Sequence, residues 1–463
     1  MGKTKLSPAR RVALKVLDEA RRHDAYVRDV LDGTVLEGLE LRDAGLVRRL
    51  ALGVTATQGC LDELLDRFLA KPSKVAPRVR IALRISAFEL MYLGTPAEAA
   101  VSQGVELARS VLPAASGLAN AVLRKIATAA EDYLSATDVV DETRAVVAMA
   151  RHAGLPVWLA SEIVASLGED VAASLFAAEL EPAPIAAHAV RDAEASDVDS
   201  WGLPGCVTPV DVRDGRVRHG LAEGSLAVSD AHAQLIATAA TRPGSCLEIG
   251  AGRGTKTYIM QAQAKRAGFK HIHIALDLYE GKCRKNKERL EQAGLAAAVR
   301  TIAGNACDLD AALSDFDAEV GERRLFGTVF VDAPCSGTGT MRRHPEIPWR
   351  LTSEDVDRNL PQLQLAMLTQ AATRVAPKGE LLYATCSVLK QENDNVIEAF
   401  LSSPQGAGFK LVPLSEAEIF QHPTFKQVIP AIKAHESTKG FFQSIPAPGD
   451  FDGHFCARLI RSI

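Results

Sequence analysis

The chain has 463 residues, of which 47% are hydrophobic and 24% are charged, and its formal net charge is -4. These values predict two or three globular domains with real hydrophobic cores. No apolar run approaches the roughly 18 residues that a membrane span requires, and the amino end leads into an amphipathic pattern without the apolar core of a signal peptide. We therefore expect a cytoplasmic protein without membrane segments.

The eight cysteines are scattered, with no Cys-x-x-Cys pair and no Cys/His cluster at the spacing of a metal site. In a reducing compartment such cysteines remain free thiols. The sequence therefore predicts neither a metal site nor a disulfide.

Residues 1–140 predict an all-helical domain, because Val12, Val16 and Ala20 recur at helical spacing with charges between them. Further helices are expected over 43–70, 77–92, 98–112 and 116–130. Over residues 1–130 the chain has 20 Lys+Arg against 14 Asp+Glu, a balance of +6, whereas the rest carries -10. These basic residues can meet phosphates, or they can be no more than the solvated faces of amphipathic helices.

The rest of the chain divides into two zones. Residues 141–225 mix helical patterns with loops rich in proline and glycine, and we interpret them as a small connecting α/β subdomain. Over 226–463, hydrophobic strands alternate with helices, which is typical of a Rossmann-like domain with a doubly wound, mostly parallel sheet. The expected strands are Ser245–Ile249, His271–Asp277, Val299–Ala303, Thr328–Asp332 and Glu380–Thr385.

A glycine-rich loop follows the first of these strands. Its residues are Gly250, Ala251, Gly252, Arg253, Gly254, Thr255 and Lys256. Glycine allows a sharp turn and a close approach of a ligand to the main chain, but the loop can also be only a tight turn. Asp277, at the end of the second strand, adds a carboxylate that accepts hydrogen bonds from ribose hydroxyls, so the two features together indicate an adenosine-containing cofactor. Asn305 is a candidate for the adenine edge, or a loop residue before the next helix.

Two cysteines stand just beyond two further hydrophobic strands, Cys335 in Asp332-Ala-Pro-Cys and Cys386 in Thr-Cys-Ser. Ligands of open α/β sheets bind at the carboxyl ends of the strands, so we expect both thiols to face one crevice. Nothing here resembles a hydride-transfer site, whereas two thiols and a carboxylate suit methyl transfer to a pyrimidine. This chemistry favours S-adenosylmethionine over a dinucleotide.

The chemistry needs these groups because cytosine C5 is too poor a nucleophile to attack a methyl sulfonium unaided. A thiolate must first add to C6 and push electron density onto C5. The carboxyl group of Asp332 suits a hydrogen bond to N3, which eases that addition, and a second thiol can assist release after methylation. The residues alone leave open whether Cys335 or Cys386 is the nucleophile.

The segments from Asp332 to Trp349 and from Tyr383 to Asn393 resemble the signature motifs of the RNA (cytosine-5) methyltransferases, most closely those of the bacterial RsmB/Sun type. Residues 87–93 and 116–124 resemble the NusB-type RNA-binding domain that this type carries, so the resemblance covers the whole chain. It implies that Cys386 is the nucleophile and Cys335 the releasing cysteine.

The chain departs from the family in the cofactor loop, where the family's usual Asp-x-Cys-Ala-Ala-Pro-Gly-Gly-Lys-Thr is replaced by Glu248-Ile-Gly-Ala-Gly-Arg-Gly-Thr-Lys-Thr257. Lys256 is retained, and we expect binding to survive with altered geometry. Within the first motif, Arg342, Arg343 and His344 offer cations for phosphates, while Trp349 can either stack on a base or pack.

The prediction from these observations is a monomeric, S-adenosylmethionine-dependent RNA cytosine-5 methyltransferase. The resemblance of the amino-terminal domain favours small-subunit ribosomal RNA as the substrate. One alternative is the same reaction on transfer RNA, because relatives with this catalytic domain modify transfer RNA. Another is a non-catalytic RNA-binding factor whose altered loop no longer holds the cofactor.

Overall fold

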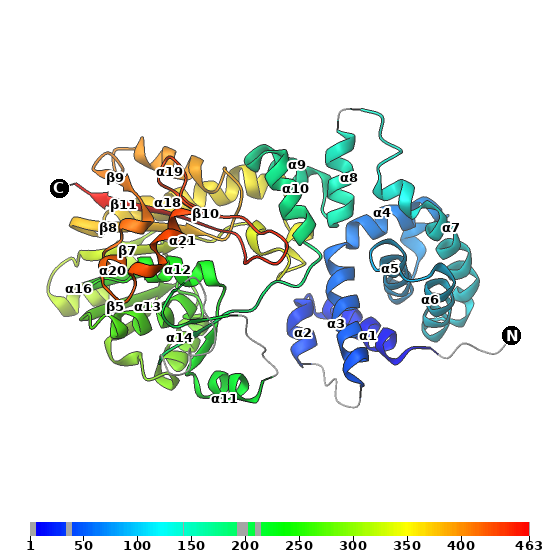
Figure 1. The fold of residues 1–463 in the computed structure, drawn as a ribbon, viewed down its shortest axis with the longest axis horizontal. Coiled ribbons are helices and arrows are strands. Elements are labelled where there is room, and N and C mark those ends of the chain that lie inside the picture. Colours follow the sequence, from blue (N-terminus) through cyan, green and yellow to red (C-terminus); the bar gives the residue numbers. More distant parts are fainter. Residues whose placement is uncertain (1–5, 34–38, 142, 192–201, 209–213, 463) are drawn as a thin grey trace. The chain divides into compact units, whose positions relative to one another are not determined.

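The computed structural model describes residues 6–33, 39–141, 143–191, 202–208 and 214–462 (Figure 1). The chain forms two compact units. The first consists of Met1–Pro182 and Met341–Leu351, and the second of Ala183–Thr340 and Thr352–Ile463. The division into domains at 140 and 225 stays a prediction. Among the described residues, no helix has both the length and the apolar character needed to cross a bilayer.

The first unit is helical, as the sequence predicts. Its helices are α1 (Pro8–His23), α2 (Val27–Gly33), α3 (Leu41–Ala56), α4 (Gln58–Phe68), α5 (Pro77–Met91), α6 (Ala97–Val111), α7 (Ser116–Leu134), α8 (Arg144–Ala153), α9 (Val157–Leu167), α10 (Glu169–Ala178) and α17 (Ile347–Arg350). Helix α5 begins with Pro77, whose missing N–H would have no partner in a first turn anyway. The region 43–70 contains two helices, because the backbone leaves the helical conformation at Thr57. Leu50, Leu61 and Ile85 are fully buried in the core that these helices share.

The segment Met341–Leu351 belongs to this helical unit, although it directly follows one of the two cysteine motifs. Trp349 packs against the helical core, and its Nε1 donates a hydrogen bond to the carbonyl of Ala56 at 2.6 Å. A Cβ atom at Gly59 would come within 1.9 Å of the Trp349 ring, so the ring fills the space that the glycine leaves. Of the two alternatives for Trp349, packing is therefore the one observed.

The arginines predicted to meet phosphates are partly neutralised within the unit. Arg10 forms an ion pair with buried Glu89, and Arg84 one with Asp62. Arg80 bridges Asp62 and Asp66 at 2.9 and 2.7 Å. These three arginines are therefore engaged in ion pairs within the unit, while its net charge is unchanged by that pairing.

The second unit is built on an eight-stranded sheet. Its strands are β4 (Gly244–Ile249), β5 (His271–Asp277), β6 (Val299–Ala303), β7 (Phe326–Asp332), β8 (Val375–Thr385), β9 (Phe409–Val412), β10 (Phe442–Ser444) and β11 (His454–Arg461). The order is β10-β11-β8-β7-β4-β5-β6, with β9 paired to β11. Strands β8, β7, β4, β5 and β6 pair in parallel, whereas β11 runs antiparallel to β8, β9 and β10. The predicted mostly parallel sheet and its five strands are confirmed.

The remaining elements of this unit are a small antiparallel sheet and a set of helices. The small sheet has the order β2-β1-β3, with β1 at Ala187–Ala189, β2 at Cys206–Val207 and β3 at Leu226–Val228. The helices are α11 (Gly215–Glu223), α12 (Ala231–Ala239), α13 (Thr255–Arg266), α14 (Glu280–Gln292), α15 (Leu309–Ala312), α16 (Ser314–Val320), α18 (Leu360–Ala372), α19 (Asp394–Leu401), α20 (Glu418–Gln421) and α21 (Ile429–Lys433).

Both faces of the large sheet are buried at its central strands, such as β7 and β8. Successive residues of a strand point to opposite faces, and along β7 Val329 and Val331 lie in one core while Phe330 lies in the other. The strand order reverses at β4, from which the chain proceeds to β5 and β6 on one side and later to β7 and β8 on the other. A crevice at the carboxyl ends of β4 and β7 is therefore where a ligand is expected.

Candidate active site

The two predicted cysteines come together at the carboxyl ends of β7 and β8. These strands are parallel neighbours in which Asp332 is the partner of Ala384, so the residues just beyond each strand end lie side by side. The Sγ atoms of Cys335 and Cys386 are 3.4 Å apart, and both residues are half-buried. The structure thus brings both thiols together at one edge of the sheet, next to the strand end that carries Asp332.

The two thiols have different proton affinities. The hydrogen bond with Cys335 lowers the pKa of Cys386 to about 7, and the nearby charges of His454 and Lys256 add to this effect against the opposing effect of burial. The same hydrogen bond and burial raise the pKa of Cys335 well above its ordinary value. Cys386 is therefore the sulfur that is more readily a thiolate near neutral pH.

A buried polar network, which sequence reasoning did not find, supports the loops that carry the thiols. The carboxylate of Glu392 accepts hydrogen bonds from the backbone N–H of Ser336 at 2.8 Å, from Gln364 Nε2 at 2.9 Å and from Ser387 Oγ at 2.7 Å. Asn393 donates to the carbonyl of Ser387 at 2.9 Å. Glu392 lies in the second motif, but nothing in that motif predicts that its carboxylate joins both cysteine loops.

Asp332 is held by the lysine of the glycine-rich loop. Lys256 Nζ lies 2.7 Å from Asp332 Oδ2. Burial alone lowers the pKa of Lys256, but Asp332 more than offsets this, and the resulting pKa lies above the ordinary value. Lys256 is therefore a cation in the site, fixed on the carboxylate.

His454 is a further site residue that sequence reasoning missed. Strand β11 pairs antiparallel with β8 so that Phe455 faces Thr385, and the next pair along this register is His454 and Cys386. His454 is buried, and its Nε2 lies 3.4 Å from Asp230 Oδ1. His454 is the first residue of β11, and its position beside Cys386 can be known only from strand pairing.

Asp230 is itself fixed in place. It is the N-cap of α12, accepting a hydrogen bond from the backbone N–H of His232 at 2.9 Å, and it also accepts one from the N–H of Asp452. Burial lowers the pKa of His454, but the interaction with Asp230 outweighs burial, so its pKa is raised. A positive His454 next to Cys386 favours the thiolate.

The glycine-rich loop has the conformation that the glycines were expected to allow. Gly250, Gly252 and Gly254 all have positive φ angles, of 80°, 57° and 81°. A Cβ at Gly250 would lie 2.2 Å from the carbonyl oxygen of Asp332, and one at Gly254 would lie 2.0 Å from Asn286 Oδ1. At Gly252 the nearest atom would be 3.9 Å away, so this glycine leaves open space beside the main chain.

Asp277 faces this loop, and its contact with a ribose stays a prediction. Its Oδ2 accepts a hydrogen bond from the N–H of Gly252 at 2.9 Å, and its Oδ1 accepts one from the N–H of Tyr279 at 3.0 Å. Each carboxylate oxygen keeps a second lone pair for a hydroxyl. The open side of Gly252 and the oriented carboxylate fit the adenosine part of S-adenosylmethionine, so the residues present suit this cofactor.

The other loop residues are less directly available to a ligand. Thr255 Oγ1 accepts a hydrogen bond from Arg289 at 2.8 Å, Ala251 is buried and Arg253 is exposed. Asn305 is exposed, and its Oδ1 accepts a hydrogen bond from the N–H of Cys307 at 2.9 Å, which is a local turn. The second lone pair of Oδ1 and the NH₂ group of Asn305 remain available for a ligand. Its contact with adenine stays a prediction.

The sheet order and the loop at its switch point define the second unit as a Rossmann-like domain. The family described as 16S rRNA methyltransferase RsmB/F matches residues 238–460, and the NusB family matches residues 7–128. The chain belongs to the RsmB/F methyltransferase family, carries a NusB domain and uses S-adenosylmethionine.

Curated relatives cover most of the chain. Ribosomal RNA small subunit methyltransferase B of Pseudomonas syringae pv. tomato is 32% identical over 81% of this chain and 82% of its own length. The protein of the same name from Pseudomonas putida is 31% identical over 92% of each. Among solved structures, the crystal structure of PH0851 is 20% identical and has a TM-score of 0.72, covering 99% of this chain and 100% of its own. That last likeness supports the fold.

Proposed function

We propose that this protein methylates C5 of a cytosine in small-subunit ribosomal RNA through a covalent enzyme-RNA adduct. The observation that carries the proposal is the pair of sulfur atoms 3.4 Å apart, with the pKa of one lowered and that of the other raised. An enzyme that methylates an exocyclic amine has no need for a second thiol in contact with the first. The choice of RNA follows the relatives, which are named as small-subunit ribosomal RNA methyltransferases.

In the proposed reaction, the Cys386 thiolate adds to C6 of the cytosine, and the electron pair of the C5–C6 double bond becomes available at C5. N3 of the cytosine takes up a proton during this addition, and the N3–H donates a hydrogen bond to the Asp332 carboxylate, which Lys256 holds in place. S-adenosylmethionine, when bound at the glycine-rich loop, supplies the methyl group that C5 takes.

Release then requires loss of the C5 proton and of the sulfur at C6. Cys335 lies next to the Cys386 sulfur and is the proposed acceptor of the C5 proton, once its own proton has left to solvent. The C5–H electron pair re-forms the C5–C6 double bond, and the S–C6 bond breaks with its electrons returning to Cys386 as thiolate.

Bisulfite sequencing of ribosomal and transfer RNA from a deletion strain, with and without a plasmid copy of the protein, tests the proposal. The expected result is one ribosomal cytosine that loses its protection in the deletion strain and regains it with the wild-type plasmid, but not with Cys386→Ala. Loss of protection only in transfer RNA would instead favour the transfer RNA alternative. If calorimetry finds no binding of S-adenosylmethionine at millimolar concentration, the catalytic proposal fails.

A further inference from the structure

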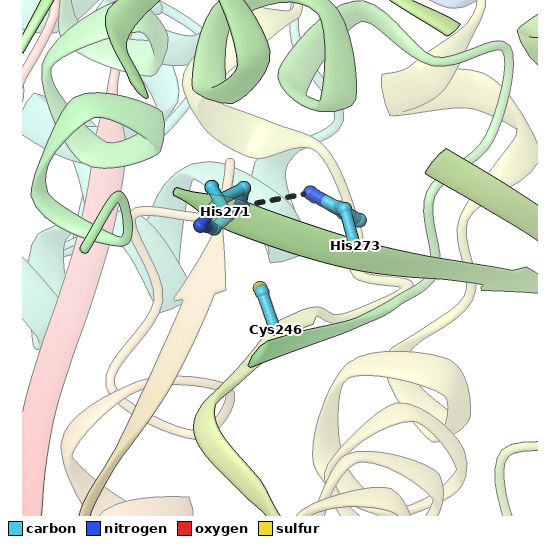
Figure 2. Close-up of side chains that lie close together, drawn as sticks. All are labelled: Cys246, His271 and His273. Atoms are coloured by element: carbon cyan, nitrogen blue, oxygen red, sulfur yellow. Dashed lines mark hydrogen bonds between the residues drawn. The ribbon is translucent and has the colours of Figure 1, made fainter. Parts of the chain in front are cut away.

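Three buried side chains at the amino ends of β4 and β5 form a cluster separate from the thiol site. The parallel register makes Cys246 the partner of His273, and His271 lies two residues earlier on the same strand face. The Sγ of Cys246 and one ring nitrogen of each histidine lie within 4.8 Å of one another, and all three residues are buried (Figure 2). Cys246 is four residues before Gly250, about 13 Å along an extended strand.

Hydrogen bonds determine which ring nitrogens face inward as lone pairs. His271 Nδ1 lies 2.7 Å from the carbonyl oxygen of Arg242, which can only accept, so this nitrogen carries the proton. His273 Nε2 lies 2.9 Å from Glu248 Oε2 and donates to that carboxylate. In the neutral rings, the other two nitrogens, His271 Nε2 and His273 Nδ1, therefore carry no proton. Each presents a lone pair toward the space between the rings.

These two nitrogens are only 3.3 Å apart, as the dashed line in Figure 2 marks. Two lone pairs at this distance repel each other unless a proton or a metal ion lies between them. Two imidazoles bound tetrahedrally at about 2.0–2.1 Å to one Zn²⁺ place their nitrogens about 3.3–3.4 Å apart. The observed separation thus suits a shared metal ion without movement of the rings.

The groups around the cluster also suit a cation. Glu248 is fully buried; its Oε2 accepts hydrogen bonds from His273 and from Thr257 Oγ1, whereas its Oε1 has no partner among the described residues. A buried carboxylate needs a compensating positive charge. A divalent cation bound next to the Cys246 thiolate and the Glu248 carboxylate gives a site with no net charge. A carboxylate that accepts a hydrogen bond from the other ring nitrogen of a ligating histidine is also usual in zinc sites.

We propose that Cys246, His271 and His273 bind one Zn²⁺ ion, with Glu248 orienting His273. A thiolate and two imidazoles are a zinc-type ligand set. Gln261 is the candidate fourth ligand: its Nε2 lies 3.3 Å from His273 Nδ1, and a flip of the amide group would place its oxygen there instead. The metal would join β4 to β5 immediately before the glycine-rich loop, and it is separate from the methylation chemistry.

Metal analysis of the full-length protein tests this proposal. The expected result is about one zinc per chain after purification without chelators, and a thiolate-to-cobalt charge-transfer band after exchange with Co²⁺. In Cys246→Ala and His273→Gln the zinc content should fall at least tenfold. Cys283→Ala, which removes another buried thiol of the same unit, should leave it unchanged.

Wild-type protein gives a second measurement that needs no variant. After removal of metal with a chelator, zinc at about 100 times its dissociation constant should raise the unfolding midpoint by about 5 °C or more, and Mg²⁺ should not. The proposal is overturned if the wild-type protein carries no zinc and gains no stability from it. It is also overturned if Cys246→Ala binds zinc as the wild type does, since a proton on His273 paired with Glu248 then accounts for the cluster.

Discussion

Cys335 and Cys386 are 51 residues apart in the chain, yet their sulfur atoms are 3.4 Å apart because β7 and β8 are parallel neighbours that end at the same edge of the sheet. Each thiol changes the proton affinity of the other. Because the hydrogen bond stabilises the thiolate of Cys386 at the expense of the thiolate of Cys335, the two sulfurs are not equivalent. Their replacement should therefore have different consequences.

Cys386→Ala should abolish turnover, since no thiolate remains to add to C6. Cys335→Ala should instead accumulate a protein-RNA adduct, because addition and methylation still occur while release is impaired. A denaturing gel with labelled RNA separates the adduct from free protein. Cys60→Ala, a buried thiol of the helical unit, is the control and should resemble the wild type. If the adduct accumulates in Cys386→Ala, the two roles must be exchanged.

The reactivity of Cys386 should depend on pH with a midpoint near its lowered pKa. Below a pH of about 7 the thiol is protonated, so its rate of alkylation by iodoacetamide should fall about tenfold per pH unit, and above that value it should level off. Mass spectrometry of the Cys386 peptide after short exposures measures this rate. A midpoint at pH 8.5 or above, the ordinary range of a free thiol, would contradict the proposed activation.

His454→Gln should shift this profile toward higher pH, because it removes a positive charge that favours the thiolate. Glutamine keeps a polar side chain of similar size, so a shift in midpoint without loss of the folded state indicates an electrostatic role. His219→Gln, at an exposed position on α11, is the matched control and should leave the midpoint unchanged. If both variants behave as the wild type, His454 does not assist Cys386.

The glycines of the cofactor loop should divide into two kinds. Gly250→Ala should lower the free energy of unfolding by about 2 kcal/mol or more, because its φ of 80° is unfavourable for alanine and the new Cβ would meet the carbonyl oxygen of Asp332. Gly252→Ala meets no protein atom, so it should cost only about 1 kcal/mol from its φ of 57°.

Binding of S-adenosylmethionine distinguishes the same two variants. If the open side of Gly252 receives the cofactor, Gly252→Ala should weaken binding at least tenfold in calorimetry while the protein stays folded. Binding at wild-type affinity would place the cofactor elsewhere. Chemical denaturation measures the accompanying changes in stability.

The five parallel strands of the second unit could be predicted closely, because they are mostly apolar runs that end near a glycine or a polar residue, whereas β9, β10 and β11 were not among the expected strands. Strands β5 and β6 have the predicted limits, His271–Asp277 and Val299–Ala303. The end of α3 at Ala56 was less predictable, since the apolar pattern continues through Thr57 into α4. The backbone leaves the helical conformation at Thr57, where no glycine or proline marks a helix end.

Only the site residues that lie within the sequence motifs could be predicted. Cys335, Cys386 and Asp332 stand beside strand ends, so their convergence follows from parallel pairing. His454 and the cluster of Cys246 with His273 depend on lateral neighbours, and lateral neighbours are set by strand order and register. Because Cys246 and His273 are separated by a whole helix in the chain, a search for metal-ligand spacing could not detect them.

Trp349→Ala tests whether the segment after the first cysteine motif serves stability or RNA stacking. The indole fills the space beside Gly59 and donates a hydrogen bond to Ala56, so its removal leaves a cavity and an unpaired carbonyl. We expect the free energy of unfolding of the helical unit to fall by about 2–4 kcal/mol, because the side chain is partly buried. Differential scanning calorimetry measures this change, and gel-shift titration measures RNA affinity under conditions where the variant is folded. Unchanged stability together with weaker RNA binding would show that the indole meets a base instead.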